Sequence, residues 1–438
     1  MLCRRNGCSL PLFMRISETK RNVLFNYMGT GITIAVPLLA LPWYISLLGM
    51  KNWGLISFIW LLQSLLGILN AGIGQVLISK FSKLAHQNHA QREVAELFFG
   101  FEKLYWAVSV VIGVVLIALS EKIAAVWLQP AGVALTDGQK VICAAGLIFM
   151  LKFPVSVYQS ALFGLGLQGS YNIASSALML FRHAVAVLLL LVWTNIETYL
   201  IWIVVSFSLE SIVLAYMAWQ RVGVRYFTFR WQFKKVKAVL IVSLGFSLAV
   251  IIGMLTLQLD KLMISWMLPI EQLGYYAIAS AVGIGVIQIA DPITRSVLPT
   301  ISRLQSDSVS LMAFNFKVLA MMAAIICMVG ITYAAVGEWF LRLWLKDAHL
   351  VDVIMPVLTV LLCGSAMNTM YLVGNMNWVA SGQSSRFLMI NTLGLIIAVM
   401  LTPIMIEHYS LVGAAFPWVA LNFIGLLLGF DWIRKGEV

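Results

Sequence analysis

Charged residues are scarce in this chain: Asp, Glu, Lys and Arg make up 11% of its 438 residues, whereas hydrophobic residues make up 61%. A mean hydropathy of +0.94 excludes a soluble globular protein. Cysteine is also scarce, and its five residues show neither a zinc-binding pattern nor a spacing suited to an extracytoplasmic disulfide. We therefore predict no metal site and no cofactor. No cleavable signal sequence is visible, and Met14 is an alternative start.

Long apolar runs are what the chain has in abundance. Twelve of them reach about twenty residues, the length that crosses the hydrocarbon core of a membrane. Each must be helical, because lipid offers no hydrogen-bond partner to a free backbone N–H or C=O. The predicted fold is an all-α integral membrane protein with transmembrane helices at residues 23–48, 54–79, 104–128, 141–163, 171–193, 199–219, 239–266, 274–298, 316–339, 353–373, 387–406 and 409–432.

The net charge of +11 is divided unevenly between the two sides of the membrane. If the N-terminus is cytoplasmic, nineteen of the 29 Lys and Arg residues lie in cytoplasmic segments, five lie on the opposite side and five lie within spans. This positive-inside asymmetry predicts that both termini are cytoplasmic. We interpret the densest basic run, at residues 220–238, as a topology signal that contacts anionic membrane lipid and not as a nucleic-acid site.

The basic run also separates two halves of six spans each. Because six is an even number, both halves enter the membrane in the same orientation. The predicted organisation is a cytoplasmic tail, an N-terminal lobe, a basic linker, a C-terminal lobe and a second cytoplasmic tail, at residues 1–22, 23–219, 220–238, 239–432 and 433–438.

A weak internal repeat supports this division. A shift of 220 residues places Gly54 on Gly274, and a shift of 216 places Gly166 on Gly382. Such a parallel repeat favours two six-helix lobes that face each other across a central cavity and rock to give alternating access.

Two cations lie near the midplane of the first lobe, where burying each one costs about 3 kcal/mol. Lys152 and Arg182 each stand eleven residues from both ends of their span. One interpretation is a structural ion pair between Glu210, in the sixth span, and one of these cations. A single carboxylate cannot neutralise two cations, so a net positive charge should remain for an anionic cargo. Arg182 is the preferred contact, because its planar guanidinium can grip phosphate oxygens at two points.

Further charged residues lie in the second lobe. We expect Lys261 and Arg295 to be cavity residues that contact substrate. Asp260 and Asp291 are candidate coupling groups, although Asp291 and Arg295 stand four residues apart and favour a local ion pair. In the first lobe, His183 is either a packing histidine or a fourth coupling group besides Glu210.

Two prolines within the first span and a glycine-rich stretch between the fourth and fifth spans carry two further expectations. Pro37 and Pro42 predict that the first span is bent and acts as a hinge. Residues 164–169 read GLGLQG and match a dinucleotide-binding pattern, but they follow a membrane helix and no strand, so we interpret them as a cytoplasmic turn.

Two stretches of the sequence resemble a known family. Residues 48–58 read LGMKNWGLISF and continue to NAGIG at residues 70–74, which is similar to the first-hairpin signature of bacterial polysaccharide flippases. DKLMI at residues 260–264, followed by QLGYYAIA at 272–279, is similar to their second-lobe signature. Asn70 departs from the pattern, because members often carry Asp there.

This resemblance is to the O-antigen and lipid-linked-oligosaccharide exporters of the multidrug and polysaccharide exporter superfamily. It implies a MATE-like fold with a cationic cavity, in a bacterial inner membrane. It implies as cargo a lipid-linked anionic oligosaccharide on undecaprenyl pyrophosphate, moved from the cytoplasmic to the periplasmic leaflet. Other polysaccharide-assembly proteins are candidate partners. A proton or sodium counter-ion that exchanges through Glu210, Asp260 or Asp291 is compatible with the sequence but not required by it.

Three other functions remain open. A multidrug exporter of the same superfamily takes cationic drugs, but the first span contains no Asp or Glu and the midplane surplus is positive. A membrane polymerase or ligase needs a catalytic surface, yet the longest extracytoplasmic loop spans about twenty residues, 119–140, without carboxylates at a useful spacing. A scaffold for sugar-assembly proteins would not need midplane cations.

Overall fold

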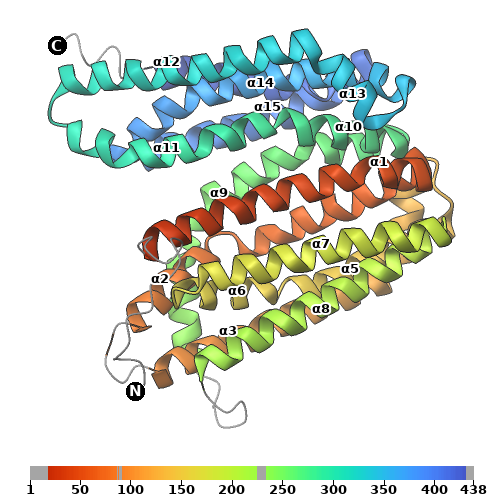
Figure 1. Cartoon of the computed structure of the whole chain (residues 1–438), viewed down its shortest axis with the longest axis horizontal. Helices are drawn as coiled ribbons and strands as arrows, with labels where there is room; N and C mark the ends of the chain where they lie inside the picture. The colour runs from red at the N-terminus through yellow and green to blue at the C-terminus, as the bar shows by residue number, and fades with distance from the viewer. Residues whose placement is uncertain (1–17, 86, 88–90, 224–232, 431–438) are drawn as a thin grey trace, which may run out of the picture.

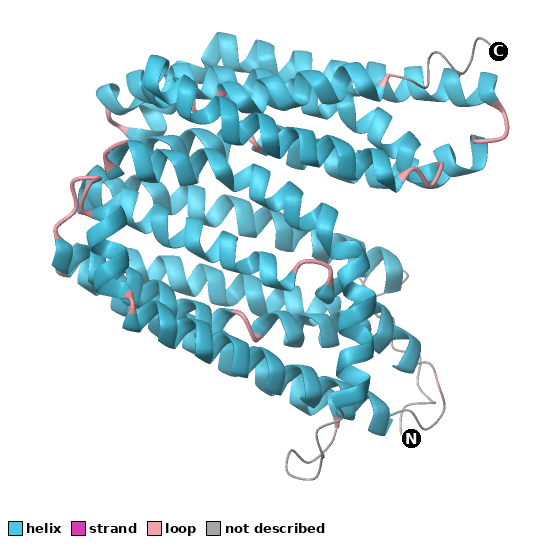
Figure 2. Ribbon diagram, turned by 180° about the vertical axis from the view of Figure 1, so that it is seen from behind, coloured by secondary structure: helices cyan, strands magenta, loops and turns pink. Residues whose placement is uncertain are grey.

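The computed structural model describes residues 18–85, 87, 91–223 and 233–430. Every regular element within these ranges is a helix, as Figure 2 shows. The all-α prediction is therefore confirmed for the described part of the chain. The predicted tails and most of the predicted basic linker lie outside the described residues.

The first lobe is formed by the helices before the linker. Its elements are α1 (Glu18–Gly67), η2 (Ile68–Asn70), α2 (Ile73–Ala85), α3 (Gln91–Ala118), α4 (Ser120–Ile123), η3 (Ala124–Leu128), α5 (Leu135–Lys152), α6 (Val155–Gly164), α7 (Gln168–Val192) and α8 (Ile196–Val222).

The second lobe follows the linker. Its elements are α9 (Phe233–Met267), α10 (Ile270–Gly283), α11 (Gly285–Leu304), α12 (Ser308–Thr332), η5 (Tyr333–Gly337), α13 (Glu338–Leu345), α14 (Ala348–Ala380), α15 (Ser384–Gly413) and α16 (Phe416–Gly429). A π-helical turn, η3, follows α3 and the short helix α4 in the first lobe, and a second one, η5, follows α12 in the second lobe, so the two lobes share this irregularity.

Nine stretches of the described residues are long and apolar enough to cross a membrane. The first of them, Gly31–Asn70, contains 40 residues. At 1.5 Å per residue it is about 60 Å long, enough for two crossings. Gly49 divides it, since its φ of 78° lies outside the helical region. The structure thus accounts for several predicted spans within longer helices, whereas the total of twelve stays a prediction.

The two lobes lie one above the other in Figure 1, with α9 between them. They contact each other mainly through α1 against α10 and α9. The lobes meet near α10 and α13 and diverge toward the end where α1 begins (Figure 1). We call these the closed end and the open end. A single cluster of buried side chains spans both lobes at the closed end.

The internal repeat is visible in the backbone. Gly166 and Gly382 both adopt positive φ, 76° and 73°, which glycine accepts without a steric penalty. Each is followed by the same six-to-one hydrogen bond, from Leu167 N to Leu162 O and from Gln383 N to Trp378 O, both at 2.8 Å. This Schellman geometry ends α6 and α14 in the same way. It also confirms that residues 164–169 form a turn between helices.

The predicted prolines do not interrupt their helix. Pro37 and Pro42 lie inside α1, and the residue of α1 with non-helical angles is Gly49. The break falls at a glycine because positive φ costs other residues energy. Whether the segment around the two prolines bends during transport remains a prediction.

Candidate functional site

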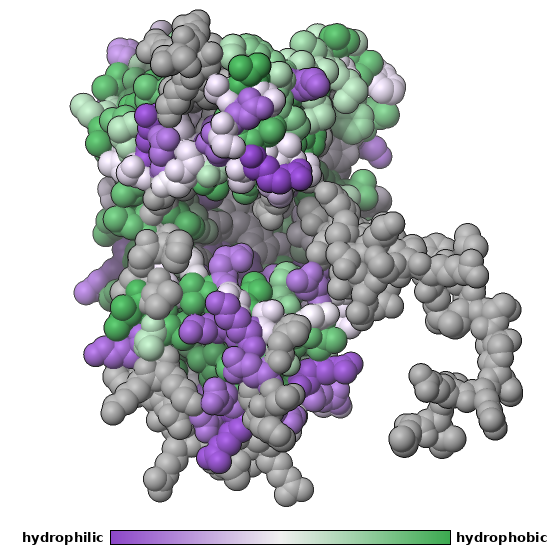
Figure 3. Space-filling view, turned by 90° about the vertical axis from the view of Figure 1, so that its left-hand side faces the viewer, coloured by the Kyte–Doolittle hydropathy of each residue, from purple (hydrophilic) through white to green (hydrophobic). Residues whose placement is uncertain are grey.

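A cavity of about 590 Å³ lies between the lobes. Figure 3 shows it as a hollow between the upper and lower halves of the molecule, viewed from the open end. Its lining comes from α1, α6 and α7 of the first lobe and from α10 and α11 of the second: Thr33, Ile34, Pro37, Leu38, Gln159, Tyr171, Asn172, Ser175, Ser176, Ala281 and Gln288. The described lining is thus rich in hydroxyl and amide groups and carries no formal charge.

Lys152 is the first of the predicted cations. It ends α5, where Pro154 separates that helix from α6 because proline provides no backbone N–H. Its Nζ lies 5.3 Å from the ring centre of Trp60 and 5.6 Å from that of Phe207, so it points into the first lobe. The side chain is nevertheless exposed, and within the described residues it makes no salt bridge. Charged side chains at membrane depth usually face the interior of the helix bundle or a water-filled space, and the position of Lys152 fits this rule.

Arg182 and Glu210 form a buried ion pair between α7 and α8. Arg182 Nε also donates to Ser206 Oγ at 2.9 Å, and its guanidinium carbon lies 3.7 Å from the ring centre of Phe207. The guanidinium is only 6% exposed. The predicted alternative of a structural pair therefore describes Arg182, and the positive charge left over belongs to Lys152.

Lys152, Arg182 and Glu210 form one electrostatic group, which we call the first-lobe charge cluster. Phe207 contacts both cations, and Glu210 interacts electrostatically with Lys152. Glu210 also interacts with Tyr171, which lines the central cavity. The cluster therefore lies beside the cavity, although neither cation is among the described residues that line it. The predicted contact of these cations with cargo in the cavity stays a prediction.

His183 occupies the neighbouring position on α7. Its Nδ1 is 2.8 Å from Tyr44 Oη on α1, and the residue is 9% exposed. This contact joins α1 to α7, as a packing histidine would. A coupling role for His183 remains a prediction.

In the second lobe, Asp260 and Lys261 contact each other. Lys261 Nζ lies 3.3 Å from Asp260 Oδ1, and Tyr276 donates its hydroxyl to Asp260 Oδ2 at 2.7 Å. Asp260 also lines a small pocket with Thr256 and Thr402. Lys261 is therefore locally compensated, unlike Lys152. The side chains of Asp291 and Arg295 lie outside the described residues, so their predicted pairing and roles remain predictions.

Two sets of buried polar residues escaped the sequence analysis. Glu102 on α3 is fully buried and accepts hydrogen bonds from Tyr158 and Trp219 at 2.9 and 2.8 Å. It falls two residues before the predicted third span, so its burial had no sequence signal. The second set consists of amide pairs that link helices of the second lobe, Asn315 with Asn377 and Asn368 with Asn422. Asparagines inside apolar helices were the available signal for these pairs.

Comparisons with solved structures support the fold. The structure is similar to the lipid II flippase MurJ in an inward closed conformation, with a TM-score of 0.73 and 14% identity over 94% of this chain and 87% of that one. It is also similar to an inward-facing MATE multidrug resistance transporter, with a TM-score of 0.68 and 12% identity over 92% and 95%. A third similar structure is a transporter of the MOP superfamily from Pyrococcus furiosus with a binding pocket of reversed polarity, with a TM-score of 0.55 and 12% identity over 99% and 100%.

At such identities these structures establish the fold alone, which is that of a multi-pass helical membrane protein. A search of curated protein sequences gives no match. The profile of a family described as "Polysaccharide biosynthesis protein" matches residues 46–354, which is more than half of the sequence. That segment includes both stretches with flippase-like signatures and the whole first-lobe charge cluster. The chain therefore belongs to this family of polysaccharide biosynthesis proteins.

Proposed function

We propose that this protein is a flippase for an undecaprenyl-pyrophosphate-linked oligosaccharide, an O-antigen or a similar surface polysaccharide unit. The cargo would move from the cytoplasmic to the periplasmic leaflet of a bacterial inner membrane. The observation that carries the proposal is Lys152 in the first lobe, an exposed residue whose ammonium makes no salt bridge with any described residue. Family membership and the likeness to a lipid II flippase support it.

The cavity and the charge cluster divide the recognition of such a cargo. Sugar hydroxyls suit the neutral lining, where Gln159, Ser175 and Gln288 offer hydrogen-bonding groups. The diphosphate suits the cluster next to it, because a phosphate oxygen near Lys152 gains a charge-assisted hydrogen bond. The polyprenyl tail would remain in lipid, since its transfer into a polar cavity is unfavourable.

The charge state of the cluster also fits an anion. Arg182 and Glu210 neutralise each other, so the group carries one net positive charge from Lys152. An inside-negative membrane potential favours outward movement of an anion by about 2.3 kcal/mol per charge per 100 mV. Outward transfer of a diphosphate therefore needs no obligatory counter-ion. Proton or sodium exchange through Glu210 or Asp260 remains an additional proposal.

A multidrug exporter is the nearest alternative, because several similar structures are MATE transporters. A cationic drug requires an available carboxylate in the cavity. Glu210 is paired with Arg182, and Asp260 contacts Lys261 and Tyr276. The geometry therefore favours the anionic cargo.

The proposal is tested by complementation of a deletion strain. Lys152→Ala should reduce polysaccharide export about 10- to 100-fold at unchanged protein level, because a hydrogen bond to a charged group contributes about 1.5–3 kcal/mol. Lys152→Arg should retain part of the export. Lys317→Ala is the matched control, since Lys317 is an exposed lysine on α12 of the second lobe.

The same strains separate the remaining functions. A flippase defect leaves undecaprenyl-linked sugars on the inner leaflet. Accumulation of unpolymerised units outside would instead indicate a polymerase. Full export by the Lys152→Ala protein would overturn the proposal.

A further inference from the structure

The lobes touch at the closed end through two glycines. A Cβ atom added at Gly54 would overlap the carbonyl oxygen of Ile270 and lie 2.8 Å from its carbonyl carbon. A Cβ added at Gly274 would lie 3.0 Å from Met50 Cε and 3.2 Å from Gly54 N. The second limb of α1 and the start of α10 therefore meet almost backbone to backbone. Only glycine permits this approach at Gly54.

The contact is reciprocal under the internal repeat. The shift of 220 residues that places Gly54 on Gly274 also places Met50 on Ile270. Gly54 faces Ile270, and Gly274 faces Met50. When two residues contact each other and their equivalents in the other lobe make the same contact in return, the contact lies on a two-fold axis. The glycine contact thus lies on the axis that relates the two lobes.

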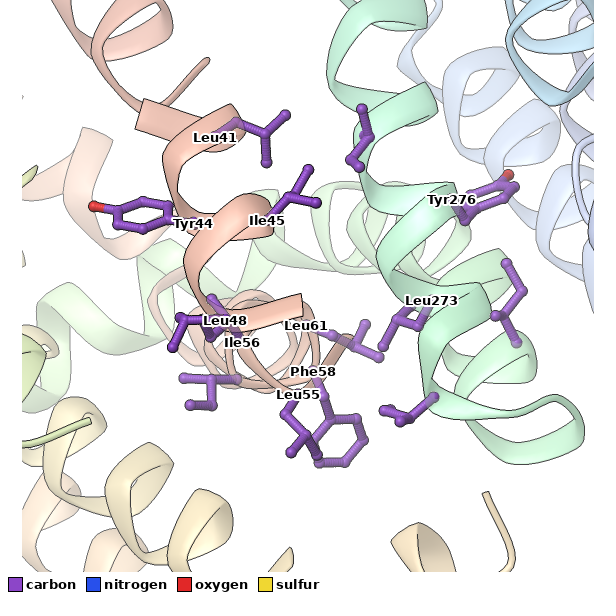
Figure 4. Close-up of a cluster of buried hydrophobic side chains, with 14 of the residues drawn as sticks. Leu41, Tyr44, Ile45, Leu48, Leu55, Ile56, Phe58, Leu61, Leu273 and Tyr276 are labelled. Carbon is purple, nitrogen blue, oxygen red and sulfur yellow. The ribbon is translucent and has the colours of Figure 1, made fainter. Parts of the chain in front are cut away.

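Apolar side chains surround this contact. In Figure 4, Leu41 and Ile45 extend from α1 toward α10, and Leu273 extends from α10 toward α1. These three residues are at most 9% exposed and belong to the cluster that spans both lobes. They close the cavity at this end by excluding water.

Few polar interactions reinforce the closed end. Ile270 N donates to Ala131 O at 3.0 Å, and Trp127 Nε1 donates to Ser265 Oγ at 3.2 Å. In contrast, Trp53 Nε1 and Ser57 Oγ, on the same limb of α1 as Gly54, are buried and have no hydrogen-bond partner among the described residues. A buried polar group without a partner loses the hydrogen bonds that water would provide. Separation of the lobes would restore those bonds.

We propose that the glycine contact is the extracytoplasmic gate of this transporter, held closed by backbone packing and predisposed to open by Trp53 and Ser57. The inference rests on the proposed function and on the predicted cytoplasmic N-terminus, which places the open end, where α1 begins, on the cytoplasmic side. In the outward-facing state Gly54 and Gly274 separate, and water reaches both unpartnered groups. Because the glycine contact lies on the axis that relates the two lobes, a small rotation of one lobe relative to the other opens this end.

The gate is tested by labelling a cysteine placed between the lobes. Ile45→Cys is the reporter, treated with a membrane-impermeant maleimide in right-side-out vesicles. The same treatment of the protein without the Ile45→Cys substitution measures the background labelling of Cys327 and Cys363, which are exposed thiols. A minor open state is commonly populated at 0.1–10%, so a change that prevents closure can raise the labelling rate by about tenfold or more.

Three glycine variants give a graded result. Gly54→Ala should raise the labelling rate most, because its Cβ would meet the Ile270 backbone. Gly274→Ala should raise it less, because the atoms nearest its Cβ include the flexible Met50 side chain. Gly67→Ala is the control on the same helix, since a Cβ there meets no atom within 4 Å. Ser57→Ala should lower the rate, because it removes one unpartnered group from the closed gate.

Labelling of the Gly54→Ala or the Gly274→Ala protein at the parent rate would overturn the proposal. If Gly54→Ala does not accumulate in the membrane, Gly274→Ala decides the result alone. The experiment needs no cargo, so it separates the gate from the proposed function. A graded labelling result in a protein that transports no sugar would leave the gate in place and overturn only the function.

Discussion

The two lobes share a backbone plan but differ in what they bury. The first lobe holds the charge cluster of Lys152, Arg182 and Glu210, and one of its cations is unpaired. In the described part of the second lobe, the buried polar side chains are uncharged serines, threonines and asparagines, and Lys261 is compensated by Asp260. The repeat therefore conserves the arrangement of helices and not their electrostatics. We therefore expect anion recognition to depend mainly on the first lobe.

Breaking the ion pair of the first lobe should give the largest effect. Arg182→Ala leaves Glu210 buried without a partner, which should destabilise the protein by about 3–5 kcal/mol and abolish export. Thermal unfolding in detergent and membrane protein level measure the loss. Arg182→Lys should preserve part of both properties, because a cation remains beside Glu210.

The double variant Arg182→Met with Glu210→Gln is the control for this prediction. It removes both charges, so it should be more stable than Arg182→Ala alone. Equal stability of the Arg182→Ala protein and the unmodified protein would show that the pair is not buried as described.

Breaking an amide pair of the second lobe should have an intermediate effect, on stability alone. Asn377→Ala leaves the fully buried Asn315 side chain without both of its bonds to Asn377. The expected loss is about 1–3 kcal/mol, measured by thermal unfolding. Export per molecule should not change, since no charge near the cavity is altered.

Replacing both asparagines with leucine should restore much of that stability, because no polar group is then left without a partner. If Asn377→Ala instead reduced export per molecule strongly at full stability, the second lobe would take part in cargo recognition. The contrast between the lobes would then fail.

The smallest effect is expected from the second-lobe lysine. Lys261→Met removes a cation that already contacts Asp260, and Tyr276 continues to donate to the carboxylate. We expect export to fall by less than about threefold, which corresponds to about 0.6 kcal/mol. Quantified surface polysaccharide, with Lys152→Met measured alongside, provides the comparison. A loss as large as that of Lys152→Met would show that both lobes hold the anion.

Much of the fold could be predicted because membrane insertion depends on local sequence. Long apolar runs predicted helices, and the shift that places Gly166 on Gly382 predicted an internal repeat, in agreement with the equivalent helix ends found at these two glycines. The boundaries were less accurate. The first two predicted spans share one helix that turns only at Gly49, since a single glycine with positive φ is enough to redirect the chain.

The site was predicted as a set of residues but not as an arrangement. Depth in the span identified Lys152, Arg182 and Glu210 as neighbours. It could not decide which cation pairs with Glu210, because that depends on how α7 rotates against α8. Glu102 was missed for a similar reason: its burial comes from α6 and α8 and not from its own segment.

The sequence by itself determined that this is a helical membrane protein with repeated halves, polar residues at midplane depth and a surplus of positive charge. These properties follow from hydropathy, spacing and composition, which are local or additive. Only the tertiary structure decided that Lys152 makes no salt bridge with the described residues, that the described part of the cavity lining carries no charge, and that Gly54 meets Gly274. Those properties depend on the packing of helices distant in the chain, because pairing and closure are set by which side-chain faces meet.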